Sequence, residues 1–97
     1  MSNKHTVVVL LEAKQGKEAE LEAALQSVAD LSRDETANIE YRIHQNSDNP
    51  QQFILYENWE NEEKHAEQFE KTYIKEFADK LADILAKPYQ AYFAKEL

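Results

Sequence analysis

The sequence contains no cysteine, a single glycine and only two prolines among its 97 residues. Without cysteine the chain can form no disulfide, thiolate metal site or iron–sulfur cluster, and it has no cysteine nucleophile. Phosphate-binding loops of the GxGxxG and GxxxxGKS types need several glycines, because backbone N–H groups must approach the phosphates closely. The single glycine, Gly16, therefore excludes nucleotide sites of both designs.

Basic residues are scarce as well: 11 Lys and Arg residues stand against 19 Asp and Glu residues, which gives a net charge of −8. Such a chain repels phosphate backbones and anionic lipid surfaces. No apolar run approaches the ~20 residues that span a bilayer, and the N-terminus lacks the apolar region and cleavage site of a signal peptide. We therefore expect a cytoplasmic protein that binds neither nucleic acid nor a membrane.

Apolar patterning predicts six elements of secondary structure. Strands are predicted from β-branched or aromatic runs and from alternation, as at Ile39, Tyr41 and Ile43, which should face the same way. Helices are predicted from apolar residues three and four apart, with a break near Lys71–Thr72 in the second one. In chain order the predicted strands are 5–13, 38–45, 52–59 and 89–93, and the predicted helices are 17–32 and 61–86.

This order of elements favours an α+β, ferredoxin-like βαββαβ domain over residues 1–97, with a four-stranded antiparallel sheet and both helices on one face. The first and third strands are apolar on both of their faces, so the helices leave apolar surface uncovered. A second copy of the chain in a two-fold homodimer is the simplest cover. We expect any ligand cavity to lie in the hollow that the two sheets enclose.

Three stretches of the chain carry a family resemblance. They are the turn at residues 12–17 (EAKQGK), the segment 32–41 (SRDETANIEY) and the strand 53–59 (FILYENW). In this order and spacing they resemble the antibiotic biosynthesis monooxygenase (ABM) family, which includes quinol monooxygenase-like proteins and forms dimeric α/β barrels. The resemblance implies the same barrel here, and it spans the whole chain.

The resemblance also implies a chemistry. Better-known members of the family oxidise electron-rich phenols with O₂ without a metal or flavin. Such a reaction needs a base to deprotonate the substrate, a dry pocket with fixed donors and aromatic walls. The implied function is a cofactor-independent monooxygenase acting on a small, quinol-like aromatic.

Two positions depart from the family pattern. The family usually has a histidine nine residues after the tryptophan of the third stretch, and here that position is Gln68. Ala37 replaces a usual glycine. The haem-degrading branch of the fold uses an Asn, a Trp and a His, which correspond by spacing to Val9, Gln68 and Ala78. The resemblance thus implies no haem, and we expect no cofactor.

His65 is the candidate catalytic base. If residues 61–73 form one helix, His65 lies on the inward face beside Phe69, with Gln68 at the pocket edge as a substrate-binding candidate. The alternative is a partly buried histidine that is bonded to a carboxylate, either Glu62 or a strand residue.

Glu57 and Trp59 are candidate substrate-binding residues because they share one face of a predicted strand. An inward carboxylate must be paired or protonated, since an unpaired buried charge is costly. Arg33 or Arg42 is the expected partner. A structural ion pair at the strand end is the alternative reading for Glu57.

Arg33, Tyr41 and Tyr73 complete the set of substrate-binding candidates. Arg33 can bind a substrate oxyanion, or it can tie its loop down through a carboxylate. The two tyrosines can point hydroxyls into a cavity, or they can pack in the core. His5 and His44 have no partner at metal-ligand spacing, so we expect no metal site.

Two other classes of function stay open at this stage. One is a non-catalytic dimeric protein that binds a small ligand or is associated with stress. The other is an enzyme that isomerises or degrades a small metabolite; a phosphorylated one would require a convergent basic pocket, and the basic residues are scattered.

Overall fold

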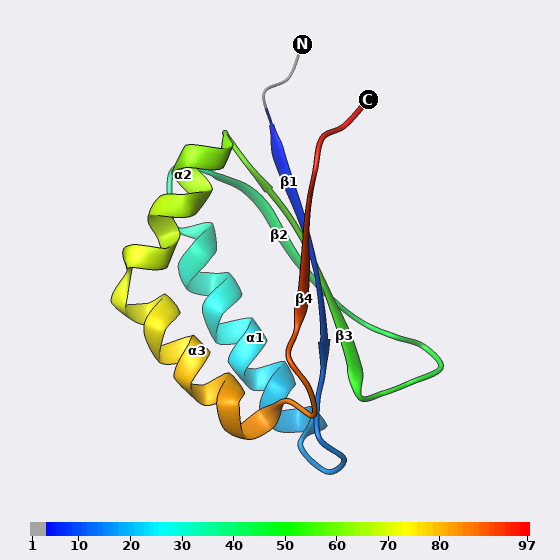
Figure 1. The fold of residues 1–97 in the computed structure, drawn as a ribbon. Coiled ribbons are helices and arrows are strands. Elements are labelled where there is room, and N and C mark those ends of the chain that lie inside the picture. Colours follow the sequence, from blue (N-terminus) through cyan, green and yellow to red (C-terminus); the bar gives the residue numbers. More distant parts are fainter. Residues whose placement is uncertain (1–3) are drawn as a thin grey trace.

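The computed structural model describes residues 4–97; Met1–Asn3, which begin the N-terminal segment predicted not to be a signal peptide, lie outside the described residues. The four strands form one antiparallel sheet in the order β2-β3-β1-β4, and the helices lie on one face of it (Figure 1). The predicted α+β ferredoxin-like fold is confirmed. The elements are β1 (His5–Glu12), α1 (Glu18–Arg33), β2 (Asn38–Gln45), β3 (Gln52–Trp59), α2 (Glu62–Glu67), the 3₁₀ helix η1 (Gln68–Glu70), α3 (Thr72–Ile84) and β4 (Gln90–Ala94).

The turn between β1 and α1 explains the position of the only glycine. Gly16 has a φ of 90°. This backbone conformation is unfavourable for any residue that has a Cβ atom, so it favours glycine. The Lys17 amide donates to the Lys14 carbonyl oxygen across this turn (2.9 Å). Glu18 and Glu20 then fill the first turn of α1, where negative charge interacts favourably with the helix dipole.

The second helical region is interrupted as predicted. Lys71 has an extended backbone (φ −76°, ψ 140°), so the chain changes direction between η1 and α3. The Lys71 amide donates to the Gln68 carbonyl oxygen and closes η1. Within residues 4–97, no helix is both long and apolar enough to cross a bilayer.

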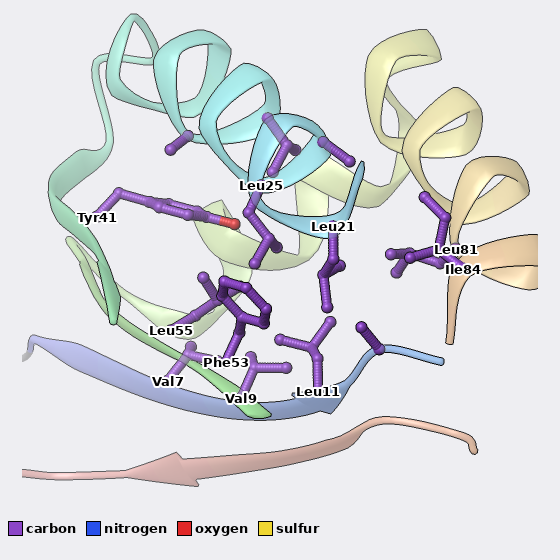
Figure 2. Close-up of a cluster of buried hydrophobic side chains, with 14 of the residues drawn as sticks. Val7, Val9, Leu11, Leu21, Leu25, Tyr41, Phe53, Leu55, Leu81 and Ile84 are labelled. Atoms are coloured by element: carbon purple, nitrogen blue, oxygen red, sulfur yellow. The ribbon is translucent and has the colours of Figure 1, made fainter. Parts of the chain in front are cut away.

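The hydrophobic core lies between the sheet and the helices (Figure 2). Side chains at alternate positions of β1 and β3 point toward α1 and α3, because successive residues of a strand face opposite sides. Tyr41 extends from β2 into the same cluster. The labelled core side chains in Figure 2 are Val7, Val9, Leu11, Leu21, Leu25, Tyr41, Phe53, Leu55, Leu81 and Ile84.

The predicted alternation of β2 is wrong at the start of the strand, at Ile39. The pairing of β2 with β3 shifts between Asn38 and Glu40, so Ile39 is an extra residue in a bulge. Its side chain is 55% exposed, whereas Tyr41 is buried as predicted.

The face of the sheet opposite the helices carries an apolar patch, which we call the outer patch. Val8, at its centre, pairs with Tyr56 on β3 and with Tyr92 on β4. Tyr92 is 52% exposed in the single chain. The outer patch consists of Val8, Leu10, Ile54, Tyr56 and Tyr92.

Candidate active site

A cavity of about 310 Å³ lies between the sheet and the helices of one chain. This cavity lies within one chain, and the expected hollow between the sheets of two chains stays a prediction. The helices leave this space because the break at Lys71 turns α3 away from the line of α2, so the two do not pack as one straight rod. The lining is mostly apolar and consists of Val7, Val9, Leu11, Val28, Tyr41, Leu55, Glu57, His65, Gln68, Phe69, Ile74, Phe77, Ala78, Leu81, Tyr89, Ala91 and Phe93.

Glu57 and His65 form the polar end of this cavity. Glu57 Oε1 accepts a hydrogen bond from Trp59 Nε1 (2.9 Å), and His65 Nε2 lies 3.9 Å from the same oxygen. Tyr41 also hydrogen-bonds to the Glu57 carboxyl group. Both Glu57 and His65 are 4% exposed, so water screens this pair weakly.

Burial changes the protonation of both groups. It raises the pKa of Glu57 to about 7, and the hydrogen bonds from Trp59 and Tyr41 limit the rise. Burial also lowers the pKa of His65 to about 4, with a smaller contribution from positive charge on His5. Near neutral pH, His65 is therefore uncharged and Glu57 exchanges its proton readily. A proton acceptor with a pKa near the working pH suits general base catalysis.

Aromatic rings surround the His65 imidazole. The centroids of Trp59, Phe69 and Phe93 lie 5.1, 5.2 and 5.6 Å from that of His65. The Asn61 side chain accepts from the Lys64 amide (2.8 Å) and caps α2, which holds the helix that carries His65. The carboxylate nearest His65 is on a strand, as one of our two alternatives for this residue proposed.

The model of the antibiotic biosynthesis monooxygenase family matches residues 4–85. The chain belongs to this family. An uncharacterised protein of Synechocystis, sll1783, is 31% identical to it over 78 residues, which are 80% of this chain and 53% of that protein. The chain thus spans about half the length of the curated relative that it matches.

Solved structures share the ABM fold over nearly the whole chain. A protein of Nitrosomonas europaea, described provisionally as an antibiotic biosynthesis monooxygenase, superimposes with a TM-score of 0.94 at 24% identity and covers 100% of this chain and 93% of that one. PA3566 of Pseudomonas aeruginosa superimposes with a TM-score of 0.92 at 21% identity, and the match covers 100% of this chain and 97% of that one. A conserved protein of Methanosarcina mazei superimposes with a TM-score of 0.90 at 21% identity, and the match covers 97% of this chain and 93% of that one. At these identities the likeness establishes the fold alone.

Gln68, at the position of the usual family histidine, is buried and its amide is already bonded. Gln68 Nε2 donates to Ser32 Oγ (2.7 Å) and to the Tyr73 hydroxyl oxygen (3.0 Å). The Tyr73 hydroxyl in turn donates to Glu35. This network joins the end of α1, the following loop and the break before α3. Gln68 lines the cavity, but Tyr73 does not.

The positions used by the haem-degrading branch also line the ABM cavity. Val9, Gln68 and Ala78 all contact it, and none of them offers a side-chain atom that binds haem iron well. The residues present therefore do not fit a haem. Within residues 4–97, no group of three or more His, Asp or Glu side chains is arranged to hold a metal ion.

The expected partners of Glu57 are wrong. Arg33 donates through Nε and Nη2 to the Tyr41 carbonyl oxygen (3.1 and 2.5 Å), and its Nη1 lies 3.2 Å from Asp30. Arg42 donates to Glu40 (2.9 Å). Burial raises the pKa of the Glu57 carboxyl group so that it holds a proton part of the time near neutral pH, and Trp59 and Tyr41 bond to its ionised form, so it needs no guanidinium. Arg33 does not line the cavity; it ties the end of α1 to β2.

The structure brings together four of the seven predicted site residues. Tyr41, Glu57, His65 and Gln68 line the cavity. Trp59 does not line the cavity; it is fully buried and contacts two residues that do, through its hydrogen bond to Glu57 and its ring contact with His65. Sequence reasoning missed His5, whose ring lies 5.1 Å from that of His65. Its position in the strand could have identified it, because alternate residues of β1 face the same side and His5 shares the inward face with Val7 and Val9.

Proposed function

We propose that the protein oxidises a small, electron-rich phenol or quinol with O₂ in the cavity between its sheet and its helices. The observation that carries this proposal is the buried Glu57–His65 pair at the polar end of an apolar cavity. A neutral imidazole and a carboxyl group with a pKa of about 7 can take a proton from a phenol near neutral pH. Membership of the ABM family supports the same class of reaction.

The reaction needs no reagent other than O₂. The substrate hydroxyl gives its proton to His65, and Glu57 stabilises the resulting charge. The phenolate then passes one electron to O₂, and the two radicals join as a peroxide on a ring carbon that carries hydrogen. The pair returns the proton to this peroxide, and loss of water from the H–C–O–OH group leaves C=O. A hydroquinone thereby becomes a hydroxyquinone.

The cavity sets the kind of substrate. Its volume of about 310 Å³ is at the lower end of the range for small-molecule sites. Phe69, Phe77 and Phe93 provide apolar aromatic wall, which suits a planar substrate with one or two rings. Glu57, His65 and Tyr41 bring hydrogen-bonding groups together at one end of the cavity, so the substrate hydroxyl is expected to point toward β3.

Wild-type protein treated with a chelator is expected to consume O₂ with at least one member of a panel of hydroquinones and dihydroxynaphthalenes. His65→Gln and Glu57→Gln are each expected to lower kcat/KM by about 10²–10⁴-fold, because each removes one partner of the proton acceptor. Oxygen-electrode traces and product spectra provide the measurement.

Exposed residues of the same types supply the controls. His44→Gln on β2 and Glu63→Gln on α2 are expected to retain wild-type turnover. Equal turnover in His65→Gln and wild-type protein would remove His65 from the reaction. Binding of phenols without O₂ uptake would favour a non-catalytic ligand-binding protein, a function that the bonded amide of Gln68 also fits.

The outer patch supports a homodimer. Leu10 and Ile54 pair across β1 and β3 on this face, and the helices within residues 4–97 all lie on the other face. Burying apolar surface against a second copy gains about 25 cal/mol for each Å² removed from water. We therefore propose that two sheets pack through their outer patches, as in a dimeric α/β barrel.

Leu10→Glu is expected to convert the protein from a dimer to a monomer at micromolar concentration, because it places a charge within the outer patch. Leu31→Glu is the matched control, since Leu31 on α1 is 44% exposed on the opposite side of the molecule. Analytical ultracentrifugation distinguishes the two states. A monomeric wild-type protein would contradict the homodimer.

A further inference from the structure

His5 is the first residue of β1, and it is 7% exposed. Its ring lies 5.1 Å from the His65 ring, tilted by 40°, and 4.7 Å from the Phe93 ring in an edge-on arrangement. His65 and Phe93 both line the cavity, whereas His5 does not. His5 therefore contacts the rings that form the polar end of the cavity from the side away from the ligand space.

The Nε2 atom of His5 has no hydrogen-bond partner. Within residues 4–97, it is the only buried side-chain nitrogen or oxygen atom of which this is true. A buried polar group without a partner costs about 1–3 kcal/mol, so proteins rarely retain one without a reason. Packing alone does not explain a histidine here, because a phenylalanine would make the same ring contacts without this cost.

Few charged groups face the two imidazoles. Glu57 on β3 approaches His65, and Tyr41 on β2 bonds to Glu57. Lys4, which precedes His5 in the chain, forms an ion pair with Glu96 (3.0 Å). On α2 the remaining charged side chains are exposed to solvent: Glu62, Glu63, Lys64 and Glu67.

We propose that His5 is a positioning residue that acts through His65: the two adjacent imidazoles carry at most one positive charge between them, so that His65 stays neutral, and able to accept the substrate proton, to a lower pH than it would without His5. Two positive rings about 5 Å apart in an enclosed site repel each other strongly. Glu57 attracts positive charge toward His65, and His5 opposes that attraction. The role in catalysis rests on the proposed phenol oxidation, whereas the pairing of the two rings does not.

The test is an NMR titration of the histidine ring nitrogens in wild-type protein and in His5→Phe. The phenylalanine ring keeps the contacts with His65 and Phe93, and it removes the charge. The pKa of His65 is expected to rise by about one unit in this variant. His5→Gln is the second variant, in case the phenylalanine disturbs folding, and His44→Gln is the control with an unchanged His65 titration.

The acid limb of the pH profile of kcat/KM is expected to move to higher pH by the same amount in His5→Phe, while the folded fraction stays unchanged. An unmoved His65 titration would overturn the pairing. A shifted titration with an unmoved pH profile would overturn the role of His5 in the reaction. If the wild-type protein oxidises no phenol, the proposed function fails on that result, and the NMR titration still decides the pairing.

Discussion

Replacing Glu57 with glutamine is expected to increase the unfolding free energy, relative to the wild-type protein, by about 3 kcal/mol as the pH rises from 4.5 to 7. The wild-type carboxyl group keeps its proton in the folded state up to a pKa of about 7, whereas the unfolded chain releases it near 4.5. Stability from this group is thus present at low pH and is lost as the pH rises through that window. Glutamine does not titrate, so the variant avoids the loss.

His65→Gln is expected to show the opposite sign. The folded pKa of His65 is depressed to about 4 from its usual 6.5, so its contribution is present above that range and is lost as the pH falls through it. Relative to the wild-type protein, this variant should therefore lose stability as the pH rises from about 4 to about 6.5. Urea unfolding at one protein concentration measures both differences, with Glu63→Gln as the control for one lost carboxylate. Parallel profiles for Glu57→Gln and wild type would show that Glu57 titrates normally.

Trp59→Ala is expected to lower the unfolding free energy by about 3–5 kcal/mol. The indole is fully buried at the end of β3, and its removal leaves a cavity beside His65. It also removes the donor to Glu57 Oε1. Urea unfolding of wild-type and variant protein measures the difference.

Trp59→Phe separates the two effects of that substitution. Phenylalanine keeps most of the volume, so the loss of stability should be clearly smaller than with alanine. The missing N–H group should raise the pKa of Glu57 further, because the ionised carboxylate loses a hydrogen bond. A carboxyl ¹³C NMR titration reports this change. Equal Glu57 titration in Trp59→Phe and wild type would mean that the indole bond does not favour the ionised form.

Local patterning predicted the fold well. Alternation along β3 placed Glu57 and Trp59 on one inward face, because residues two apart in a strand face the same side. The break at Lys71 was also predicted. Ile39 was misplaced because a bulge inserts one residue into a strand without any change in the hydrophobic pattern. That residues 1–97 form one domain, and that the protein is cytoplasmic, stay predictions.

The candidate site was predicted less completely. His65 was identified from its helical position, but the predicted partner of Glu57 was wrong, since the guanidinium groups of Arg33 and Arg42 bond to other acceptors. The proximity of His5 and His65 joins the first strand to a helix 60 positions later, and no periodicity carries that information. The side chains bonded to Gln68 come from two separate segments of the chain, the end of α1 with its following loop and the start of α3.

The amino-acid sequence by itself determined the order of strands and helices along the chain, the inward parity of β1 and β3 and the apolar character of the outer patch. These features follow from periods of two and 3.6 residues, which are properties of neighbouring positions. Only the tertiary structure decided that the cavity lies beneath the helices, and that Glu57, His65 and His5 meet at its polar end. Their shifted protonation is a consequence of burial and of contacts between distant segments, and neither exists until the chain has packed.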